Sequence, residues 1–465
     1  MNATQPGWCP QNLSQDKAAY LAIADAIARD IRDGSLPPNF RLPPQRRLAH
    51  LLGLNFTTIS RAYAEAQRRG LLDARVGQGT YVRPEACPRV RHAAARARLI
   101  DMSMNLPPEP DQPELLARME SGMRNLCGDI NSLLRYQPFG GSQEDREAGV
   151  HWLARRGVIS SAERVLVCPG THSILNALLS LLVGSGGGRI CCDNITYPGL
   201  RALAAIHGVS LIGLPSDQEG IVPDAFERAC RDSRPAALYV NPTIHNPTTL
   251  TMPLARREAL AEIAARHGVP VIEDDPYGLL PESPPPSFFA LLPGLTYYIG
   301  GLSKTVGAGL RVAYLALPDA RQLPRISGIL RAVSVMTPPV SVAIATEWVL
   351  DGTAEQLVRF VREESRVRQG LARQALGGTP YEASPDGFHV WLPLPEGWSR
   401  VSFSAHLRSS GIGVVTSDAF LVGGAAVEAV RICLGGTATR DDVSHALELV
   451  GSALSHPPAI YSSIV

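Results

Sequence analysis

Residues 297–311 read YYIGGLSKTVGAGLR, and this stretch contains Lys304, one of only two lysines in the chain. The other is Lys17, and arginine supplies the remaining 42 of the 44 basic residues. Lysine forms a Schiff base with an aldehyde, whereas arginine carries charge but cannot do so. We therefore expect this position to require a primary amine. The alternative is a codon bias toward arginine that left one surface lysine here by chance.

The size and composition of the chain limit the classes of protein to consider. A chain of 465 residues is too long for a single hydrophobic core and predicts two or three domains. No run approaches the ~20 apolar residues that cross a membrane, and we expect no signal peptide in residues 1–10, which lack a basic start followed by an apolar block. The eight cysteines show neither a CxxC pair nor metal-ligand spacing. We expect a cytoplasmic protein with no metal site and no membrane association.

The net charge of +1 hides an uneven distribution of charge along the chain. Residues 1–98 contain 15 basic and 7 acidic residues, whereas the remainder contains 29 basic and 36 acidic residues. The N-terminal segment is therefore basic and the rest of the chain is acidic. This asymmetry predicts that only the N-terminal segment binds a polyanion.

The basic segment has the pattern of a winged helix-turn-helix. We expect helices over residues 20–31, 45–52 and 56–69, with Pro44 at the first position of the second helix, and a hairpin over residues 71–82. In this fold the third helix enters the major groove of DNA. The candidate DNA contacts are polar, basic or tip residues: Arg46, Arg47, Asn55, Thr57, Thr58, Ser60, Arg61, Gly77, Gln78 and Gly79.

The same segment resembles the DNA-binding domain of GntR-type regulators. The likeness rests on Leu42-Pro43, Thr57-Thr58-Ile59, Gly70-Leu71 and the GQGTYV run at residues 77–82. It implies a DNA-binding domain over residues 12–83 that binds a double-stranded operator. Phe56 departs from the pattern, because many members have an arginine there that reads the operator. Residues 84–104 are rich in arginine and contain two prolines, which predicts a mobile basic linker.

The rest of the chain predicts an α/β domain over residues 105–465, with a smaller subdomain from about residue 335. Apolar runs alternate with helical segments, at residues 164–167, 188–192, 237–240, 270–272 and 295–299. This alternation is typical of a mainly parallel sheet. Ligands of such sheets bind at the carboxyl ends of the strands, and the informative motifs follow the strands.

Two groups of motifs lie at these strand ends. Gly170-Thr171-His172 joins a strand to a helix, where free backbone N–H groups favour phosphate. Tyr197 and Asn246 follow later strands and bring an aromatic ring and an amide to the same crevice.

Three adjacent acids, Glu273, Asp274 and Asp275, end the next strand, and Tyr277 lies just beyond them. Carboxylates this close repel one another unless one of them meets a cation, and a protonated pyridine nitrogen is such a cation. The remaining groups are an amine and a phosphate-binding guanidinium, Lys304 and Arg311.

Together these groups are the parts needed to hold pyridoxal phosphate, and residues 105–440 resemble fold-type I aminotransferases of class I. The resemblance implies that Lys304 binds the cofactor aldehyde covalently and that Asp274 pairs with the ring nitrogen. It also implies that Tyr277 and Asn246 hydrogen-bond the ring hydroxyl and that Tyr197 stacks on the ring. The phosphate is expected to be held by Gly170, Thr171, His172 and Arg311.

The resemblance assigns two further residues. Tyr136 would reach the phosphate from the partner subunit of a homodimer, and Arg431 would bind a substrate α-carboxylate bidentately. Some alternatives stay open at this point. Tyr197 can simply pack, Arg431 can be an interior salt-bridge arginine, and Glu273 and Asp275 can either support the site or be solvated.

A GntR-type segment fused to an aminotransferase-like domain resembles the MocR subfamily of bacterial regulators. This resemblance implies a PLP-dependent DNA-binding transcriptional regulator that senses an amino compound or PLP itself, working as a homodimer. The linker is long enough for a head-to-tail arrangement. The alternative is a catalytically active PLP-dependent aminotransferase acting on an amino acid and a 2-oxo acid. A third interpretation, a vitamer sensor without an amine ligand, leaves Arg431 without a role.

Overall fold

The computed structural model describes residues 8–10, 17–32, 35–37, 39–75, 79–83, 100–184, 187–424 and 427–455. The chain divides into two compact units, Met1–Ala97 and Arg98–Val465, which we call the head and the body. Among the described residues, no helix is both long and apolar enough to cross a membrane.

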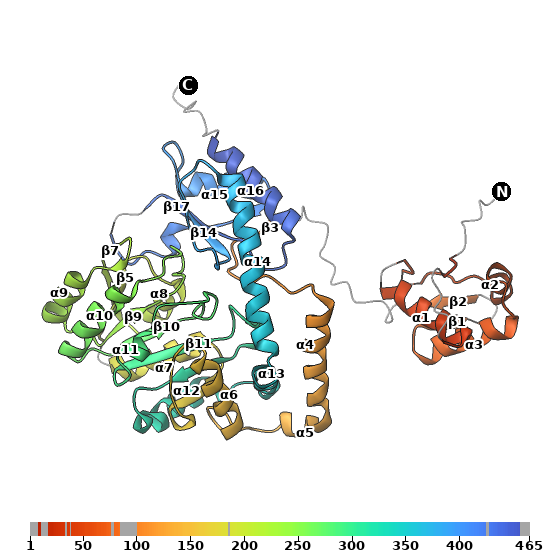
Figure 1. Cartoon of the computed structure of the whole chain (residues 1–465), viewed down its shortest axis with the longest axis horizontal. Helices are drawn as coiled ribbons and strands as arrows, with labels where there is room; N and C mark the ends of the chain where they lie inside the picture. The colour runs from red at the N-terminus through yellow and green to blue at the C-terminus, as the bar shows by residue number, and fades with distance from the viewer. Residues whose placement is uncertain are drawn as a thin grey trace. The chain divides into compact units, whose positions relative to one another are not determined.

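The head is a three-helix unit with a hairpin (Figure 1). Its elements are α1 (Ala19–Arg32), α2 (Gln45–Leu52), α3 (Phe56–Arg68) and the antiparallel strands β1 (Leu72–Arg75) and β2 (Gly79–Val82). Apolar side chains of all three helices form the core, and the buried Tyr63 hydroxyl donates to the carbonyl of Pro43 at 2.8 Å. The predicted helices and hairpin are present. Pro44 is the N-cap of α2 and not its first residue as expected.

The body contains a seven-stranded sheet in the order β4-β12-β11-β10-β9-β5-β6. Strand β12 is antiparallel to both neighbours, and the other neighbouring pairs are parallel. The five predicted strands are all present within two residues of their expected bounds, whereas β6 and β12 were not predicted. The strands are β4 (Val165–Cys168), β5 (Arg189–Asp193), β6 (Ser210–Leu214), β9 (Ala237–Val240), β10 (Val271–Asp274), β11 (Thr296–Gly301) and β12 (Ala313–Ala316).

Side chains alternate between the two faces of this sheet, as strand geometry requires. Ile272 belongs to a core with α7 (Thr171–Val183), α8 (Pro198–Ile206) and α12 (Leu323–Ser334). Its neighbour Val271 packs on the opposite face with α9 (Pro223–Ser233) and α10 (Leu254–His267). Residues of α6 (Gln143–Ala154) and α13 (Pro339–Leu350) cover that second face near β4. The sheet is therefore covered by helices on both faces (Figure 1).

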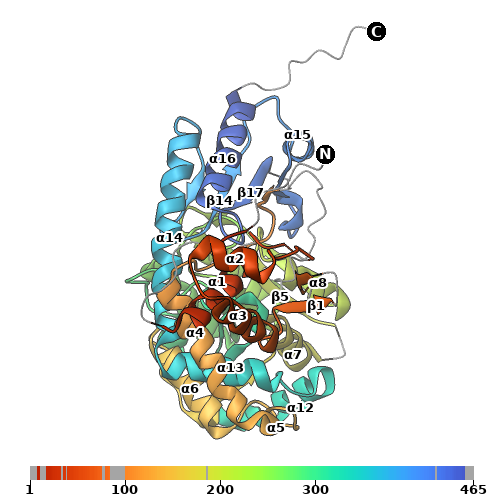
Figure 2. The same cartoon turned by 90° about the vertical axis from the view of Figure 1, so that its right-hand side faces the viewer.

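The C-terminal part of the body is a smaller α+β unit. Its antiparallel sheet has the order β13-β14-β17-β16, made of β13 (Glu382–Ala383), β14 (His389–Pro393), β16 (Val415–Thr416) and β17 (Ala429–Cys433). Helices α15 (Arg400–Ser409) and α16 (Arg440–Ser455) pack with it. The long α14 (Thr353–Leu376) runs from α13 toward α16 and contributes to the cores of both parts (Figure 2).

Short elements complete the body. They are α4 (Pro113–Asn125), α5 (Ile130–Leu133), α11 (Phe288–Leu291), the parallel pair β3 (Ile100–Asp101) and β15 (Ile412–Gly413), and the antiparallel pair β7 (Ser216–Asp217) and β8 (Gly220–Ile221).

Candidate functional site

A cavity of about 730 Å³ lies at the carboxyl ends of the body's parallel strands. Ten of the eleven residues predicted for the body line it: Gly170, Thr171, His172, Tyr197, Asn246, Asp274, Tyr277, Lys304, Arg311 and Arg431. The exception is Tyr136, which lies between α5 and α6 and is 83% exposed. One chain thus brings together every predicted group of the body except the one expected to come from a partner subunit.

Lys304 follows β11, is half-buried and lines the cavity. Its Nζ donates a hydrogen bond to the backbone carbonyl of Asn105. Burial lowers the pKa of Lys304 to about 8, and the positive charges of Arg431 and Arg311 act in the same direction. A lysine of this kind is neutral more often at physiological pH than a solvated one, and only the neutral amine is a nucleophile.

Asp274 ends β10 and has one carboxylate oxygen without a partner. The Tyr239 hydroxyl donates to Oδ2 at 2.9 Å, whereas Oδ1 is buried and accepts no hydrogen bond from the described residues. The Asn241 side chain donates to the backbone carbonyl of Asp274 at 2.7 Å and so fixes the strand end. Burial raises the pKa of Asp274 to about 7, and the charge of Asp275 adds to the shift. A cation at Oδ1 keeps such a carboxyl ionised, which fits a protonated pyridine nitrogen.

The two acids beside Asp274 already have partners. Glu273 accepts the backbone N–H groups of Phe288 and Phe289, each at 3.0 Å, and Asp275 accepts from Nε of Arg156 at 2.7 Å. Both acids are buried, so the alternative that they are solvated is wrong. Of the three adjacent carboxylates, Asp274 is the one that lines the cavity.

The start of α7 and Arg311 form the end of the cavity suited to a phosphate. Gly170 is the N-cap of α7 with φ 86°, and no side chain caps the first turn of the helix. A Cβ on Gly170 would lie 2.9 Å from Nη2 of Arg311, so glycine lets the guanidinium approach the turn. Free N–H groups, the helix dipole and a guanidinium together favour an anion.

Tyr197 and His172 form one wall of the cavity. The Tyr197 hydroxyl lies 3.3 Å from Nδ1 of His172, and the two rings meet edge to face with centroids 5.7 Å apart. Burial lowers the pKa of His172, and the charge of Arg311 adds to the effect. The wall is therefore neutral at pH 7 and can lie against an aromatic ring.

Arg431, on β17, faces the same cavity from the C-terminal part of the body. Its Nη1 donates to Oδ1 of Asn246 at 2.8 Å, and its Nη2 donates to the carbonyl of Ser103 at 2.6 Å. The guanidinium carbon lies 5.1 Å from the centroid of the Phe420 ring. Within the described part of the chain it has no carboxylate partner, so the interior salt bridge considered above is not formed.

Several residues that shape the site were not singled out from the sequence. Asn105 donates to the Tyr277 hydroxyl at 2.7 Å, although 172 positions separate the two residues. Tyr239 and Asn241 hold Asp274, as described above. Asn241 directly follows β9, but the target of its amide could not be predicted from the sequence. Asn105 and Tyr239 left no local signal, because their roles depend on tertiary contacts.

A backbone connection joins the loop after β5 to residues 417–422. The Thr196 N–H donates to the carbonyl of Phe420, and the Val422 N–H donates to the carbonyl of Asn194, both at 2.8 Å. Residues 417–422 begin with a short 3-10 helix, Ser417–Ala419. The loop that carries Tyr197 is thus tied to the segment whose Phe420 ring lies beside Arg431.

In the head, the predicted DNA contacts fall into three sets. Arg46 and Arg47 are exposed on α2. On α3, Thr57 and Arg61 are exposed, with the Arg61 guanidinium 4.4 Å from the Tyr20 ring centroid, whereas Thr58 and Ser60 are half-buried. At the hairpin, Gly79 begins β2, and Gly77 and Gln78 lie outside the described residues.

Asn55 is primarily a helix cap. Its Oδ1 accepts from both the backbone N–H and the hydroxyl of Thr57, each at 3.0 Å. This cap fixes the start of α3, where the adjacent Phe56 is 45% exposed.

Comparison with known proteins gives matches for both units. The model of bacterial regulatory proteins of the gntR family matches residues 19–82, and the model of aminotransferase class I and II matches residues 97–450. The uncharacterized HTH-type transcriptional regulator YdeF of Bacillus subtilis is 30% identical over 446 residues, which is 95% of this chain and 96% of the relative. The HTH-type pyridoxine biosynthesis transcriptional regulator PdxR of Corynebacterium glutamicum is 26% identical over 77% of this chain and 79% of its own length.

The body also matches solved structures. The structure of LysN, an alpha-aminoadipate aminotransferase from Thermus thermophilus, superposes with a TM-score of 0.70 at 23% identity, over 77% of this chain and 92% of that one. At this identity the likeness shows the fold alone. Both family models, a regulator aligned along almost the whole chain and the fold of the body agree, so the protein belongs to the MocR-type GntR regulators, in which a helix-turn-helix precedes an aminotransferase-like domain with pyridoxal phosphate as cofactor.

Proposed function

We propose that this protein is a transcriptional regulator that binds an operator through its head and senses an amino compound through the cofactor site of its body. One observation carries the proposal. Lys304, the unpartnered oxygen of Asp274 and the guanidinium of Arg431 all face one cavity, in a chain that also has a winged helix-turn-helix. Pyridoxal phosphate supplies an aldehyde that combines reversibly with amines.

The proposed roles follow from the position of each group. Lys304 would hold the cofactor aldehyde through its amine, which is the group that an amine ligand would replace. Asp274 holds the proton of the ring nitrogen, and Tyr277 and Asn246 orient the ring hydroxyl. Tyr197 covers the ring. The phosphate is held by Gly170, Thr171, His172 and Arg311, and by Tyr136 from the partner subunit.

Arg431 and its surroundings suggest the chemistry of the effector. Its guanidinium suits a single carboxylate. The lining of the same cavity includes the apolar side chains of Met104, Leu106, Val415 and Phe420, and the Phe420 ring lies beside the Arg431 guanidinium. We therefore expect an amino acid with one carboxylate and an uncharged remainder to bind better than a dicarboxylate.

A ligand in this cavity contacts both parts of the body. Asp274 ends strand β10 of the large sheet and Lys304 follows strand β11 of that sheet, whereas Arg431 lies on β17 of the smaller sheet. A ligand that binds all three favours a state in which the two parts are close, and it changes DNA affinity only if the two states differ in that affinity. We further propose a cytoplasmic homodimer, with a head-to-tail arrangement as one option, because two heads suit an operator with two half-sites.

The test is a titration of the full-length PLP-bound protein with amino acids, other amines and vitamers, followed by visible absorbance. Binding to a duplex selected from a random library is measured in parallel. We expect at least one amine to change both the spectrum and DNA affinity. A protein that binds random and selected duplexes equally under all conditions is not a specific regulator.

The second candidate is a working aminotransferase. It is favoured by the same cavity, which retains an amine, a carboxylate and a carboxylate-binding arginine. Steady turnover of an amino acid and a 2-oxo acid supports the enzyme. Amine exchange without turnover supports the sensor.

A further inference from the structure

We propose that Arg156, which does not line the cofactor cavity, is a positioning residue of the site that acts through Asp275 on Asp274. The proposal rests on PLP binding in the cavity, which is part of the proposed function, and not on DNA binding. It concerns a buried ion pair directly behind the strand end that carries Asp274.

The geometry follows from the alternation of side chains along β10. Ile272 and Val271 belong to cores on opposite faces of the sheet. By the same alternation, Asp274 shares the face of Ile272, whereas Glu273 shares the face of Val271, and Asp275 continues that order just past the strand. The two acids that do not line the cavity are thus directed away from it, toward the helices of the second face.

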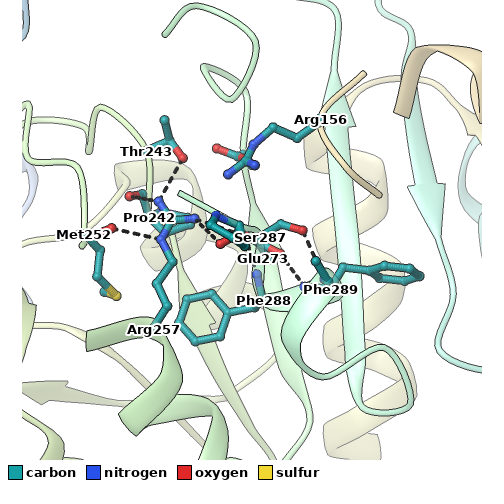
Figure 3. A network of polar contacts seen from close by, with 12 residues as sticks. Arg156, Pro242, Thr243, Met252, Arg257, Glu273, Ser287, Phe288 and Phe289 are labelled. Carbon is teal, nitrogen blue, oxygen red and sulfur yellow. Dashed lines mark hydrogen bonds and ion pairs between the residues drawn. The ribbon is translucent and has the colours of Figure 1, made fainter. Parts of the chain in front are cut away.

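Each of these two acids faces an arginine. Nη1 of Arg257, on α10, lies 3.9 Å from Oε1 of Glu273, and Nε of Arg156, just after α6, lies 2.7 Å from Oδ2 of Asp275. Figure 3 shows Arg257 among its backbone acceptors beside Glu273, with Arg156 nearby. Two charges are therefore compensated on the second face, and Asp274 is left for a cation in the cavity.

The Arg156–Asp275 pair is fixed in place. The two side chains are 2% and 0% exposed, and the Tyr298 hydroxyl also donates to Oδ2 of Asp275 at 3.2 Å. Gly278 lies against the pair, because a Cβ there would approach Arg156 Nε to 2.8 Å and would collide with the Asp275 carboxylate. A buried pair in such a close fit has little freedom to rearrange when one partner is changed.

A second, small cavity lies beside this pair and shares two lining residues with the cofactor cavity. Its volume is about 10 Å³, roughly the space of one water molecule, and Gly301 and Pro276 line both this cavity and the large one. Three of its lining residues have buried polar atoms without a hydrogen-bond partner in the described part of the chain: Arg156 Nη2, Asp275 Oδ1 and Thr305 Oγ1. Asp275 adjoins Asp274 in sequence, and Thr305 adjoins Lys304. The small cavity beside the pair is therefore lined by the chain neighbours of both Asp274 and Lys304.

The chemical consequence is electrostatic. Burial is the main cause that raises the pKa of Asp274, and the negative charge of Asp275 raises it further. The Arg156 guanidinium compensates that negative charge. Without Arg156, the uncompensated negative charge of Asp275 favours the protonated form of groups in the cofactor site and so raises their pKa. Without Asp275, the uncompensated positive charge of Arg156 disfavours the protonated form and lowers their pKa.

The experiment measures the pH midpoint of the visible absorbance change of the full-length PLP-bound protein. The variants are Arg156→Gln, Asp275→Asn and the double variant, with Arg155→Gln as the matched control. Arg155 is the neighbouring arginine, and it pairs with Glu355 instead of an acid of β10. We expect Arg156→Gln to raise the midpoint and Asp275→Asn to lower it, each by about one pH unit. The double variant and the control should remain near the wild type.

Shifts of the pH midpoint in opposite directions in the two single variants indicate an electrostatic effect. A loss of packing has no reason to move the midpoint one way for Arg156 and the other way for Asp275. If both single variants move the midpoint in the same direction, or weaken PLP binding without moving it, the pair is only structural and the proposal is wrong. If Arg156→Gln does not fold, Asp275→Asn, the double variant and Arg156→Lys decide. Arg156→Lys must then keep the wild-type midpoint. A wild type without any visible band refutes the cofactor site itself, which is a different outcome.

Discussion

The reactivity of Lys304 should depend on pH in a way that an exposed lysine cannot imitate. Burial lowers the pKa of its amine from 10.5 to about 8. At pH 7 about one amine in ten is then neutral, against about one in 3000 for an unperturbed lysine, a ratio of roughly 300. The rate at which the apoprotein combines with PLP should therefore rise about tenfold per pH unit up to pH 8 and level off above it.

The assay is stopped-flow absorbance after PLP is mixed with apoprotein between pH 6 and pH 10, followed by borohydride reduction and peptide mapping. Because the chain contains two lysines, the peptide map distinguishes a label on Lys304 from a label on Lys17. Lys304→Ala should abolish the visible band, and Lys17→Ala, at an exposed residue of the head, should not. In Asp274→Asn the plateau should begin at lower pH, because the negative charge of Asp274 raises the pKa of Lys304. A rate that keeps rising to pH 10, or label on Lys17, would falsify the assignment.

Three further predictions follow from the same contacts. The pKa of Asp274 is raised from 3.8 to about 7 in the folded protein, so ionisation of this carboxyl favours the unfolded state. Its contribution to the free energy of unfolding is therefore fully present below pH 4 and is lost as the pH rises through 7. Apoprotein with Asp274→Asn should therefore be more stable than the wild type at pH 8 by a few kcal/mol in thermal melts, and a difference that does not shrink toward pH 4 contradicts this. Asn55→Ala should lower the melting temperature of the head by about 4–8 °C in calorimetry through loss of a cap worth ~1 kcal/mol, whereas Asn55→Ser should not; equal melting of the two variants argues against the cap. Mixed dimers of Tyr136→Phe and Lys304→Ala subunits should regain the visible band and phosphate affinity at one of their two sites; if every site stays defective, Tyr136 acts within its own chain.

The cofactor site could be predicted to the extent that its groups are local in sequence. Gly170, Asp274 and Lys304 each lie at or just after the end of a strand, so the strand pattern alone places them at one edge of the sheet. The partners of these groups could not be predicted in this way. Arg156 reaches Asp275 across 119 positions, and such pairings depend on how α6 packs against the sheet. Sequence patterns identified three adjacent acids, but only the structure shows which of them has no arginine partner among the described residues.

In the head, the helices were easier to predict than the roles of individual polar residues. Its helices follow from apolar spacing, and their bounds were predicted to within one residue. The roles of polar residues at the start of α3 were harder to assign, because one side chain can cap a helix and contact DNA. Asn55 and Thr57 are hydrogen-bonded to each other in the cap. Asn55 and Thr57 can therefore contact DNA only through atoms that this cap does not use.

The tie between residues 417–422 and the loop after β5 has a consequence for how this family can diverge. Two backbone hydrogen bonds tie the loop of Tyr197 to the segment that carries the ring beside Arg431. A change in the length of this segment therefore moves the two ends of the ligand site together while every contacting residue stays the same. Proteins with identical binding residues can in this way come to answer to different compounds, and an effector cannot be read from those residues alone.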